Sequence, residues 1–311
     1  MVFKGKRIGL ALGGGGARGV AHIGVLKVLE KEGIPIDLVV GTSIGALVGG
    51  AYASGFSPDE LEKKFDGFLG SPEFQSSAIK AIEALYAKEE AGLVQKIQSF
   101  LKNRFYVMQA TLKPGFLSRE DFQAIIDYFI PDIQIEETGI PFRAVATDLV
   151  SGELITFSSG PLRQAVTASC AVPGAIEPLR DGEMVLSDGG IICLVPISIA
   201  KREGADIIIA VSADRDACSE EEFQTAKDVY LRACEIMANR LQDYELLDAD
   251  VVISLQVGDL HWSEFSQAKN LIGEGERATR ERLEDIRNAM PSRKKWFTLM
   301  EILRPSTKKG P

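Results

Sequence analysis

Residues 7–45 read RIGLALGGGGARGVAHIGVLKVLEKEGIPIDLVVGTSIG, and this stretch decides the fold. The apolar run at 7–12 ends in four glycines and predicts a short strand. A broad apolar helical pattern follows at 17–32, closed by Gly33, and a second strand is expected at 36–40. Strand, helix and strand at these lengths make one βαβ unit, so we expect the two strands to be parallel.

The remainder of the chain extends this alternation. Ser57, Pro58 and Glu60 form a capping box with proline at the first helical position, and we expect a helical insertion over about 57–140. Strand patterns return after the insertion, and a last helix is expected over 263–290. The later strands are predicted at 141–147, 153–157, 183–186, 205–211 and 251–255. Helices and strands in this order are typical of an α/β protein.

Composition limits the classes of protein to be considered. The 311 residues suffice for one large α/β domain with an insertion, or for two modest domains. Hydrophobic residues make up 45% and charged residues 25%, as in folded globular proteins. The net charge of −9 disfavours a general nucleic-acid binder, so no nucleic-acid partner is expected. The four cysteines and two histidines lack zinc-binding spacing, and we expect reduced structural thiols, no metal and no cofactor.

Three segments bear on the location of the protein in the cell. The N-terminus passes from a short basic stretch directly into the first strand, with no long apolar region or cleavage site, so we expect a cytoplasmic protein. Leu38–Pro58 is uncharged and long enough to span a bilayer, but its five glycines and its polar residues favour a buried strand, turn and helix. Arg293–Arg304 mixes basic and apolar residues and is either an interfacial helix or, as we favour, a docked C-terminal helix.

A serine and a glycine loop carry the chemistry. Gly41–Gly45 is a GxSxG motif directly after the second strand, where flanking glycines allow the sharp turn that exposes a serine hydroxyl, so Ser43 is the predicted nucleophile. Gly13–Gly19, GGGGARG, follows the first strand and can aim backbone N–H groups at negative charge. Consecutive parallel strands end at one sheet edge, so the loop should face the serine and stabilise an oxyanion.

The serine also needs a base, and histidines are scarce. His22 lies one turn into the first helix, and His261 lies in a polar loop with no strand to carry it to the crevice. We expect both to be structural. Asp188 follows a predicted strand and is held in a turn by Gly189 and Gly190, so we predict that it accepts the serine proton. The other interpretation of Asp188 is a simple turn aspartate.

The motifs GGGGARG, GTSIG and the DGG at 188–190, in this order, resemble those of the patatin-like phospholipases. The resemblance covers most of the chain, because ARGVAHIGVL at 17–26, ASCAVPGAIEP at 168–178 and the strand and helix after Ala249 also resemble bacterial members. It implies a three-layer α/β/α sandwich with a mostly parallel central sheet. The whole chain would then form a single patatin-like domain, with a C-terminal helical tail at about 291–311.

The resemblance also implies an activity. It indicates a lipid acyl hydrolase that cleaves fatty acyl esters, of a phospholipid or lysophospholipid, through an acyl-enzyme on Ser43 with Asp188 as base. Gly14, Gly15 and Gly16 would donate to the oxyanion. The implied partner is a lipid or acyl-ester substrate, with at most transient contact with a membrane surface, and the residues do not indicate an oligomeric state.

Three details stay open at this point. Arg18 either steadies the glycine loop or binds a substrate phosphate, or it is a solvated first-turn side chain. Nine of the fifteen phenylalanines lie between Phe56 and Phe129 and form either acyl-chain surface or ordinary core. Family members often carry an aromatic residue shortly after the proline that corresponds to Pro173, where this chain has Gly174–Ile176, so the acyl pocket should differ in shape.

Two other functions compete with the hydrolase. Dinucleotide-binding proteins share the GxGxxG loop, but their ribose-binding acid ends the second strand, whereas Asp37 lies at the beginning of that strand here. The second alternative is a non-catalytic lipid- or protein-binding adaptor on the same fold. The presence of a serine, an aspartate and a glycine loop together argues against it.

Overall fold

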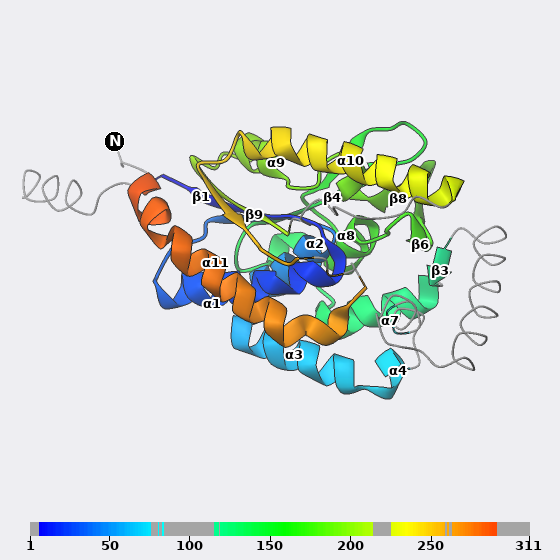
Figure 1. Cartoon of the computed structure of the whole chain (residues 1–311), viewed down its shortest axis with the longest axis horizontal. Coiled ribbons are helices and arrows are strands. Elements are labelled where there is room, and N and C mark those ends of the chain that lie inside the picture. The colour runs from blue at the N-terminus through cyan, green and yellow to red at the C-terminus, as the bar shows by residue number, and fades with distance from the viewer. Residues whose placement is uncertain are drawn as a thin grey trace, which may run out of the picture.

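The computed structural model describes residues 6–75, 80, 83, 115–117, 119–213, 225–258, 260 and 263–290. These residues form a central sheet with helices on both faces, which gives three layers (Figure 1). The α/β/α architecture expected from the sequence is therefore confirmed. The expected C-terminal tail at 291–311 lies outside the described residues.

The central strands run parallel, in the order β10-β9-β1-β2-β4. β5 and β8 pair antiparallel with β4, and β7 pairs antiparallel with β8. A separate two-stranded parallel sheet joins β3 to β6. The strands are β1 (Ile8–Leu12), β2 (Leu38–Thr42), β3 (Gly115–Leu117), β4 (Phe142–Asp148), β5 (Leu154–Phe157), β6 (Gly174–Ile176), β7 (Leu179–Asp181), β8 (Met184–Asp188), β9 (Ile207–Ser212) and β10 (Val251–Ser254).

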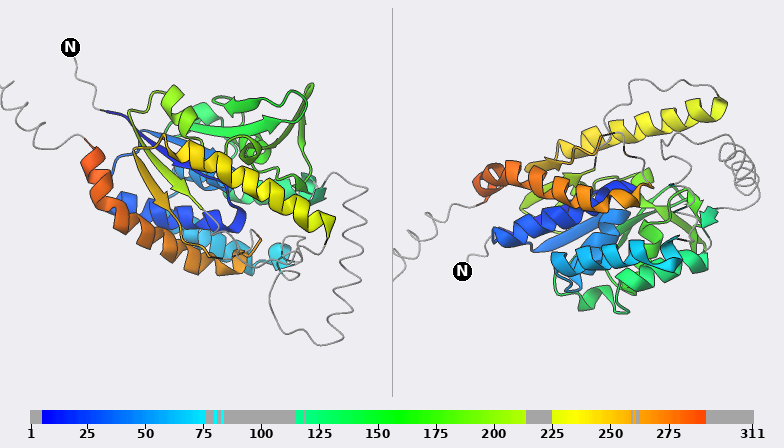
Figure 2. Two further views of the ribbon diagram at one scale, coloured as in Figure 1. Left: turned by 45° about the horizontal axis from the view of Figure 1, so that its top comes forward. Right: turned by 60° about the horizontal axis from the view of Figure 1, so that its bottom comes forward.

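The helices cover the two faces unequally. α1, α2, α8 and α11 pack on one face and share the larger hydrophobic core with α3 and α7, whereas α9 and α10 cover the other face (Figures 1 and 2). The α-helices are α1 (His22–Lys31), α2 (Ile44–Ala53), α3 (Pro58–Gly70), α4 (Pro72–Gln75), α7 (Arg119–Phe129), α8 (Leu162–Ser169), α9 (Ile197–Arg202), α10 (Ala226–Leu246) and α11 (Ala268–Ala289). Short 3₁₀ turns are η1 (Gly16–Ala21), η2 (Ile135–Glu137), η3 (Gly189–Ile191) and η4 (Phe265–Gln267).

One edge of β4 determines where the candidate site forms. β2 pairs along the first half of that edge, with Thr42 opposite Val145. β5 pairs with β4 across both halves and so occupies the other edge. β8 must therefore share the edge with β2, and it runs toward β2, with Asp188 opposite Ala146. Because Val145 and Ala146 are neighbours, Ser43, which follows β2, meets the last residue of β8 at the middle of β4.

Each strand predicted from the sequence begins and ends within two residues of the corresponding observed strand. The capping box is also confirmed, because the Ser57 hydroxyl accepts from the Glu60 amide (3.3 Å) and the Glu60 carboxylate accepts from the Ser57 amide (2.8 Å). The first helix differs from the prediction. Its N-terminal part is η1, and a Cβ at Gly19 would lie 2.1 Å from Ile44 Cγ2, so this tight turn lets α2 pack close.

The described parts of the expected insertion are mainly helical, with α3, α4 and α7, but they include the unpredicted strand β3. The uncharged segment 38–58 forms β2, a turn and α2, as expected. None of the helices within the described ranges combines the length and hydropathy needed to cross a bilayer.

Candidate active site

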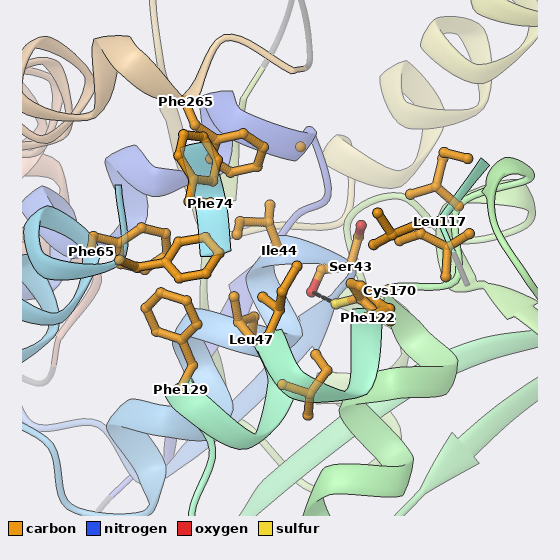
Figure 3. A pocket seen from close by; sticks show the side chains of 17 residues that line it. Ser43, Ile44, Leu47, Phe65, Phe74, Leu117, Phe122, Phe129, Cys170 and Phe265 are labelled. Atoms are coloured by element: carbon orange, nitrogen blue, oxygen red, sulfur yellow. Dashed lines mark hydrogen bonds between the residues drawn. The ribbon is translucent and has the colours of Figure 1, made fainter. Parts of the chain in front are cut away.

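Ser43 occupies a strained turn between β2 and α2. Its backbone has φ 55° and ψ −127°, and it is the only non-glycine residue with positive φ in the part of the chain that the structure describes. Such a conformation at a residue with a Cβ costs roughly 1–3 kcal/mol, so the surrounding contacts must hold it. The turn brings the Ser43 side chain to the wall of an apolar pocket (Figure 3).

The two glycines of the motif are required by packing. A Cβ at Gly41 would lie 2.4 Å from the Gly45 carbonyl oxygen, and a Cβ at Gly45 would lie 2.2 Å from the Leu12 carbonyl oxygen. Both distances are far below van der Waals contact. Only glycine at these positions lets α2 begin directly above β1 and β2 with Ser43 at its N-terminus.

Asp188 lies beside Ser43, as the pairing of β8 with β4 requires. Its carboxylate accepts a hydrogen bond from the Gly190 amide at 2.7 Å, and a side-chain hydrogen-bonding interaction with Ser43 lowers its pKa. Its carbonyl oxygen accepts from the Thr147 hydroxyl (3.0 Å). Ser43 and Asp188 are each 6% exposed, so the two residues predicted to form a dyad come together in a nearly dry environment.

Burial changes the acidity of this carboxylate. Desolvation raises the pKa of Asp188 from 3.8 to about 6, against the lowering effect of its hydrogen bonds from Ser43 and Gly190. An ordinary aspartate is too weak a base to accept a serine proton readily. A carboxylate with a pKa near neutrality is better matched to that task, because it takes up a proton more easily while still ionised at pH 7.

The glycine loop lies directly against the serine, since a Cβ at Gly14 would be 3.4 Å from the Ser43 Cβ. Its amides are not equivalent, however. The Gly14 amide, expected as an oxyanion donor, donates to the Leu194 carbonyl (3.0 Å). Gly15 and Gly16 follow with φ 142° and 59°, and Gly16 lines the same pocket as Ser43. The candidate donors are therefore Gly15 and Gly16, and the Gly14 amide serves to anchor the loop.

Arg18 contacts the glycine loop. Its Nε donates to the Gly15 carbonyl oxygen at 3.2 Å. In a trans peptide the N–H points opposite to the C=O, so this bond turns the Gly16 amide away from Arg18. The contact agrees with the loop-steadying role considered for Arg18, and its role in binding substrate stays a prediction.

His22 lies beneath the loop and is fully buried. Its Nε2 lies 2.8 Å from the Gly13 carbonyl oxygen and must carry the proton, since a carbonyl can only accept. The Nδ1 atom has no hydrogen-bond partner among the described residues. Burial lowers the pKa of His22 from 6.5 to about 4, so the ring is neutral at pH 7 and structural, as expected. His261 lies outside the described residues.

A neutral buried histidine makes stability depend on pH. Below about pH 6.5 the unfolded chain takes up a proton on His22 that the folded protein does not, so stability falls until the folded pKa near 4 is reached. We expect His22→Gln, which keeps an N–H donor, to lose less stability than the wild type over this interval. Thermal melting of both proteins between these pH values measures the difference, and parallel curves would contradict the assignment.

The pocket next to Ser43 is almost entirely apolar. Ile44 and Leu47 of α2 form one side, and the far end is closed by phenylalanines from α3, α4, α7 and η4 (Figure 3). Phe65 and Phe129 meet with ring centroids 4.4 Å apart, and Phe68 lies 5.4 Å from Phe129. The excess of phenylalanine in the sequence signalled this surface, but only the fold shows that part of it lines a cavity at the serine.

The dinucleotide alternative fails on geometry. The Asp37 carboxylate accepts from the Ile8 amide at 2.8 Å, at the N-terminal end of β1. The glycine loop follows the opposite end of the same strand. Asp37 therefore lies at the wrong edge of the sheet to bind the ribose of a nucleotide whose phosphates occupied the loop.

Comparison with known proteins gives a consistent match. A family model described as patatin-like phospholipase matches residues 10–201. An uncharacterized NTE family protein of Mycobacterium tuberculosis is 35% identical over 206 residues, which are 66% of this chain and 49% of that protein. Human patatin-like phospholipase domain-containing protein 6 is 33% identical over 213 residues, or 68% of this chain and 14% of that protein. The chain thus matches half or less of each relative's length.

Two further proteins extend the comparison. Lysophospholipase NTE1 of Yarrowia lipolytica is 32% identical over 212 residues, covering 68% of this chain and 13% of that protein. Among solved structures, VipD from Legionella pneumophila aligns with 90% of this chain and 67% of its own, at a TM-score of 0.47 and 15% identity.

Proposed function

This chain belongs to the patatin-like phospholipase family, and from that premise we propose that it is a lipid acyl hydrolase with Ser43 as nucleophile and Asp188 as base. The observation that carries the proposal is the meeting of these two residues at the middle of β4, beside a glycine loop and an apolar pocket. No other group of described residues combines a strained serine, a carboxylate of raised pKa and a cavity for an acyl chain.

The reaction divides into two steps. Ser43 Oγ attacks the ester carbonyl carbon while its proton passes to Asp188, and the oxyanion is stabilised by the Gly15 and Gly16 amides. The intermediate collapses to acyl-Ser43, and the departing alcohol takes the proton from Asp188. Water then attacks the acyl group and gives a proton to Asp188. The fatty acid leaves as that proton returns to Ser43.

The pocket supports a fatty acyl group as the part of the substrate that is recognised. Ile44, Leu47, Phe122 and Ile126 offer no hydrogen-bonding side chain, so a polar acyl group would lose its hydration without compensation. Within the family, we propose a phospholipid or lysophospholipid as the ester, in line with the name of the Yarrowia relative. Access to such lipids requires transient contact with a membrane or micelle surface.

The test is the dependence of turnover on acyl length. Each buried methylene contributes roughly 0.8 kcal/mol. For p-nitrophenyl butyrate, hexanoate and octanoate we therefore expect kcat/KM to rise about two- to fourfold per carbon. Fatty acid release from lysophosphatidylcholine and phosphatidylcholine then compares the two lipid classes. Equal kcat/KM for all three esters would contradict acyl recognition by the pocket. Binding of these esters in the pocket without turnover would favour the non-catalytic lipid- or protein-binding adaptor.

The phenylalanine wall should limit the acyl length. Phe68 is half-buried and contacts Phe74 and Phe129, with ring centroids 5.2 and 5.4 Å away. We expect Phe68→Ala to shift the preferred ester toward longer chains by opening the far end of the pocket. The matched control is Phe157→Ala, which truncates another half-buried phenylalanine on β5. Identical chain-length profiles for the two variants would show that this wall does not set the limit.

A further inference from the structure

The segment at the end of α8 contacts both residues of the proposed dyad. The Ser43 amide donates to the Ser169 hydroxyl (3.0 Å), and the Cys170 thiol donates to the Ser43 carbonyl oxygen (3.0 Å; Figure 3). Two consecutive residues therefore hold the peptide groups on either side of the strained Ser43 Cα. Since positive φ is unfavourable for serine, these contacts oppose the relaxation of the turn.

The next residue of the same segment holds the base. The Ala171 carbonyl oxygen accepts from the Asp188 amide (2.9 Å) and from the Ser187 hydroxyl (2.7 Å). β8 is thereby fixed to the end of α8 immediately before its carboxylate. The segment is rigidly placed, because Ser169 and Ala171 are fully buried and Cys170 is 7% exposed.

We propose that Ser169–Cys170–Ala171 is a clamp that fixes the separation of Ser43 and Asp188, with Ser169 and Cys170 as positioning residues for the nucleophile. This inference rests on the proposed hydrolase function. In the sequence, 141 residues separate the end of β2 at Thr42 from the start of β8 at Met184. In the fold, both strands pair with β4, which lies beside them. The clamp adds a second connection, because residues 169–171 bond directly to Ser43 and to Asp188. Neither Ser169 nor Cys170 touches the substrate carbonyl in this role.

The electrostatics of the segment suit positioning rather than chemistry. Burial, followed by the nearby charge of Asp188, raises the pKa of the Cys170 thiol well above its usual value. The thiol therefore stays protonated and keeps its S–H available for the Ser43 carbonyl. A thiolate there would place a second negative charge beside the base and remove the donor.

The test removes the hydroxyl that accepts from the nucleophile. We expect Ser169→Ala to lower kcat about 10- to 100-fold with KM nearly unchanged, because small misplacements of reacting groups carry such losses. The acid limb of the pH profile should also move upward, since a loosened Ser43 hydroxyl no longer lowers the pKa of Asp188. Cys170→Ser, which keeps a donor, should retain more activity than Cys170→Ala.

A matched control separates positioning from general destabilisation. Thr167→Ala removes another buried hydroxyl of α8, one that donates to the Arg163 carbonyl (2.7 Å) and does not contact the dyad. We expect both variants to melt at lower temperature, but only Ser169→Ala to change kcat and the pH profile. If Ser169→Ala behaves like Thr167→Ala in both respects, the clamp is refuted.

A measurement independent of turnover distinguishes failure of the clamp from failure of the proposed function. The Ser43 amide should exchange with deuterium slowly in the wild type and in Thr167→Ala, and much faster in Ser169→Ala. An inactive wild type would refute the hydrolase while leaving this result to decide the clamp. Unchanged exchange at Ser43 in Ser169→Ala would overturn the clamp whatever the activity.

Discussion

Ser43→Ala is expected to lower kcat for p-nitrophenyl octanoate by about 10⁴- to 10⁶-fold, because the reaction loses its covalent intermediate. The substitution removes one buried oxygen and leaves the glycines around the turn in place, so the fold should persist. Alanine also has no hydroxyl to donate to Asp188, and the carboxylate is left with the Gly190 amide. Initial rates on purified, folded protein measure the effect.

The control for this substitution comes from the same segment. Ser54 directly follows α2, and its hydroxyl donates to the Ala51 carbonyl (2.8 Å). It does not line the pocket. We expect Ser54→Ala to retain activity close to that of the wild type. Substantial octanoate hydrolysis by folded Ser43→Ala would show that another residue is the nucleophile.

Asp188→Asn is expected to lower kcat about 10²- to 10⁴-fold, the usual contribution of a general base. Asparagine matches aspartate in size and can still accept from the Gly190 amide, but it cannot take the serine proton at neutral pH. In the wild type, kcat/KM should fall as pH drops through about 6, because Asp188 must be ionised to act. A pH profile without a limb near this value would contradict the assignment.

The same substitution should increase stability while it removes activity. The folded pKa of Asp188 is raised from 3.8 to about 6, so its ionisation in the folded protein is unfavourable and lowers stability as pH rises through this interval. Asp188→Asn should therefore melt above the wild type at about pH 8 and lose that advantage toward about pH 4. A lower melting temperature for Asp188→Asn than for the wild type at the higher pH would argue against a carboxylate whose ionisation is made unfavourable by burial.

Local sequence patterns were sufficient to predict the glycine loop, the serine turn and the aspartate. Each is marked by neighbouring residues in the sequence, such as Gly41 and Gly45 around Ser43. The contact that requires glycine at 41 is local, with Gly45 and Ala46, whereas the contact that requires it at 45 is with Leu12 of β1. Asp188 was recognised by its place at the end of a predicted strand together with the other two motifs, because its turn alone also fits a simple turn aspartate. For the glycine loop and Ser43, the sequence predicted only that they face one crevice. It does not reveal that β8 runs antiparallel along the same edge of β4 as β2, which brings Asp188 to Ser43.

Long-range hydrogen bonds account for what sequence reasoning missed. The Gly14 amide looked like an oxyanion donor, but a carbonyl 180 residues away, at Leu194, occupies it. Ser169 and Cys170 carry no local motif of their own that would identify them as partners of Ser43. Their placement is decided by where α8 ends against the sheet, which is a property of the folded chain.

The pocket illustrates the same limit. The cluster of phenylalanines after Phe56 was visible in the sequence, yet core and acyl-chain surface have the same composition. Helix α8 escaped prediction because it is only eight residues long, and the short strand β6 because it is only three. Short elements stabilised by tertiary packing give little periodic signal.

The most direct test of the central claim is to locate the covalent adduct of a fluorophosphonate probe by peptide mass spectrometry in the wild type and in Asp188→Asn. The dyad predicts one adduct per chain on Ser43 in the wild type, formed much more slowly in Asp188→Asn because the serine then lacks its base. A folded wild type that is not labelled, or is labelled at a residue other than Ser43, would contradict the account.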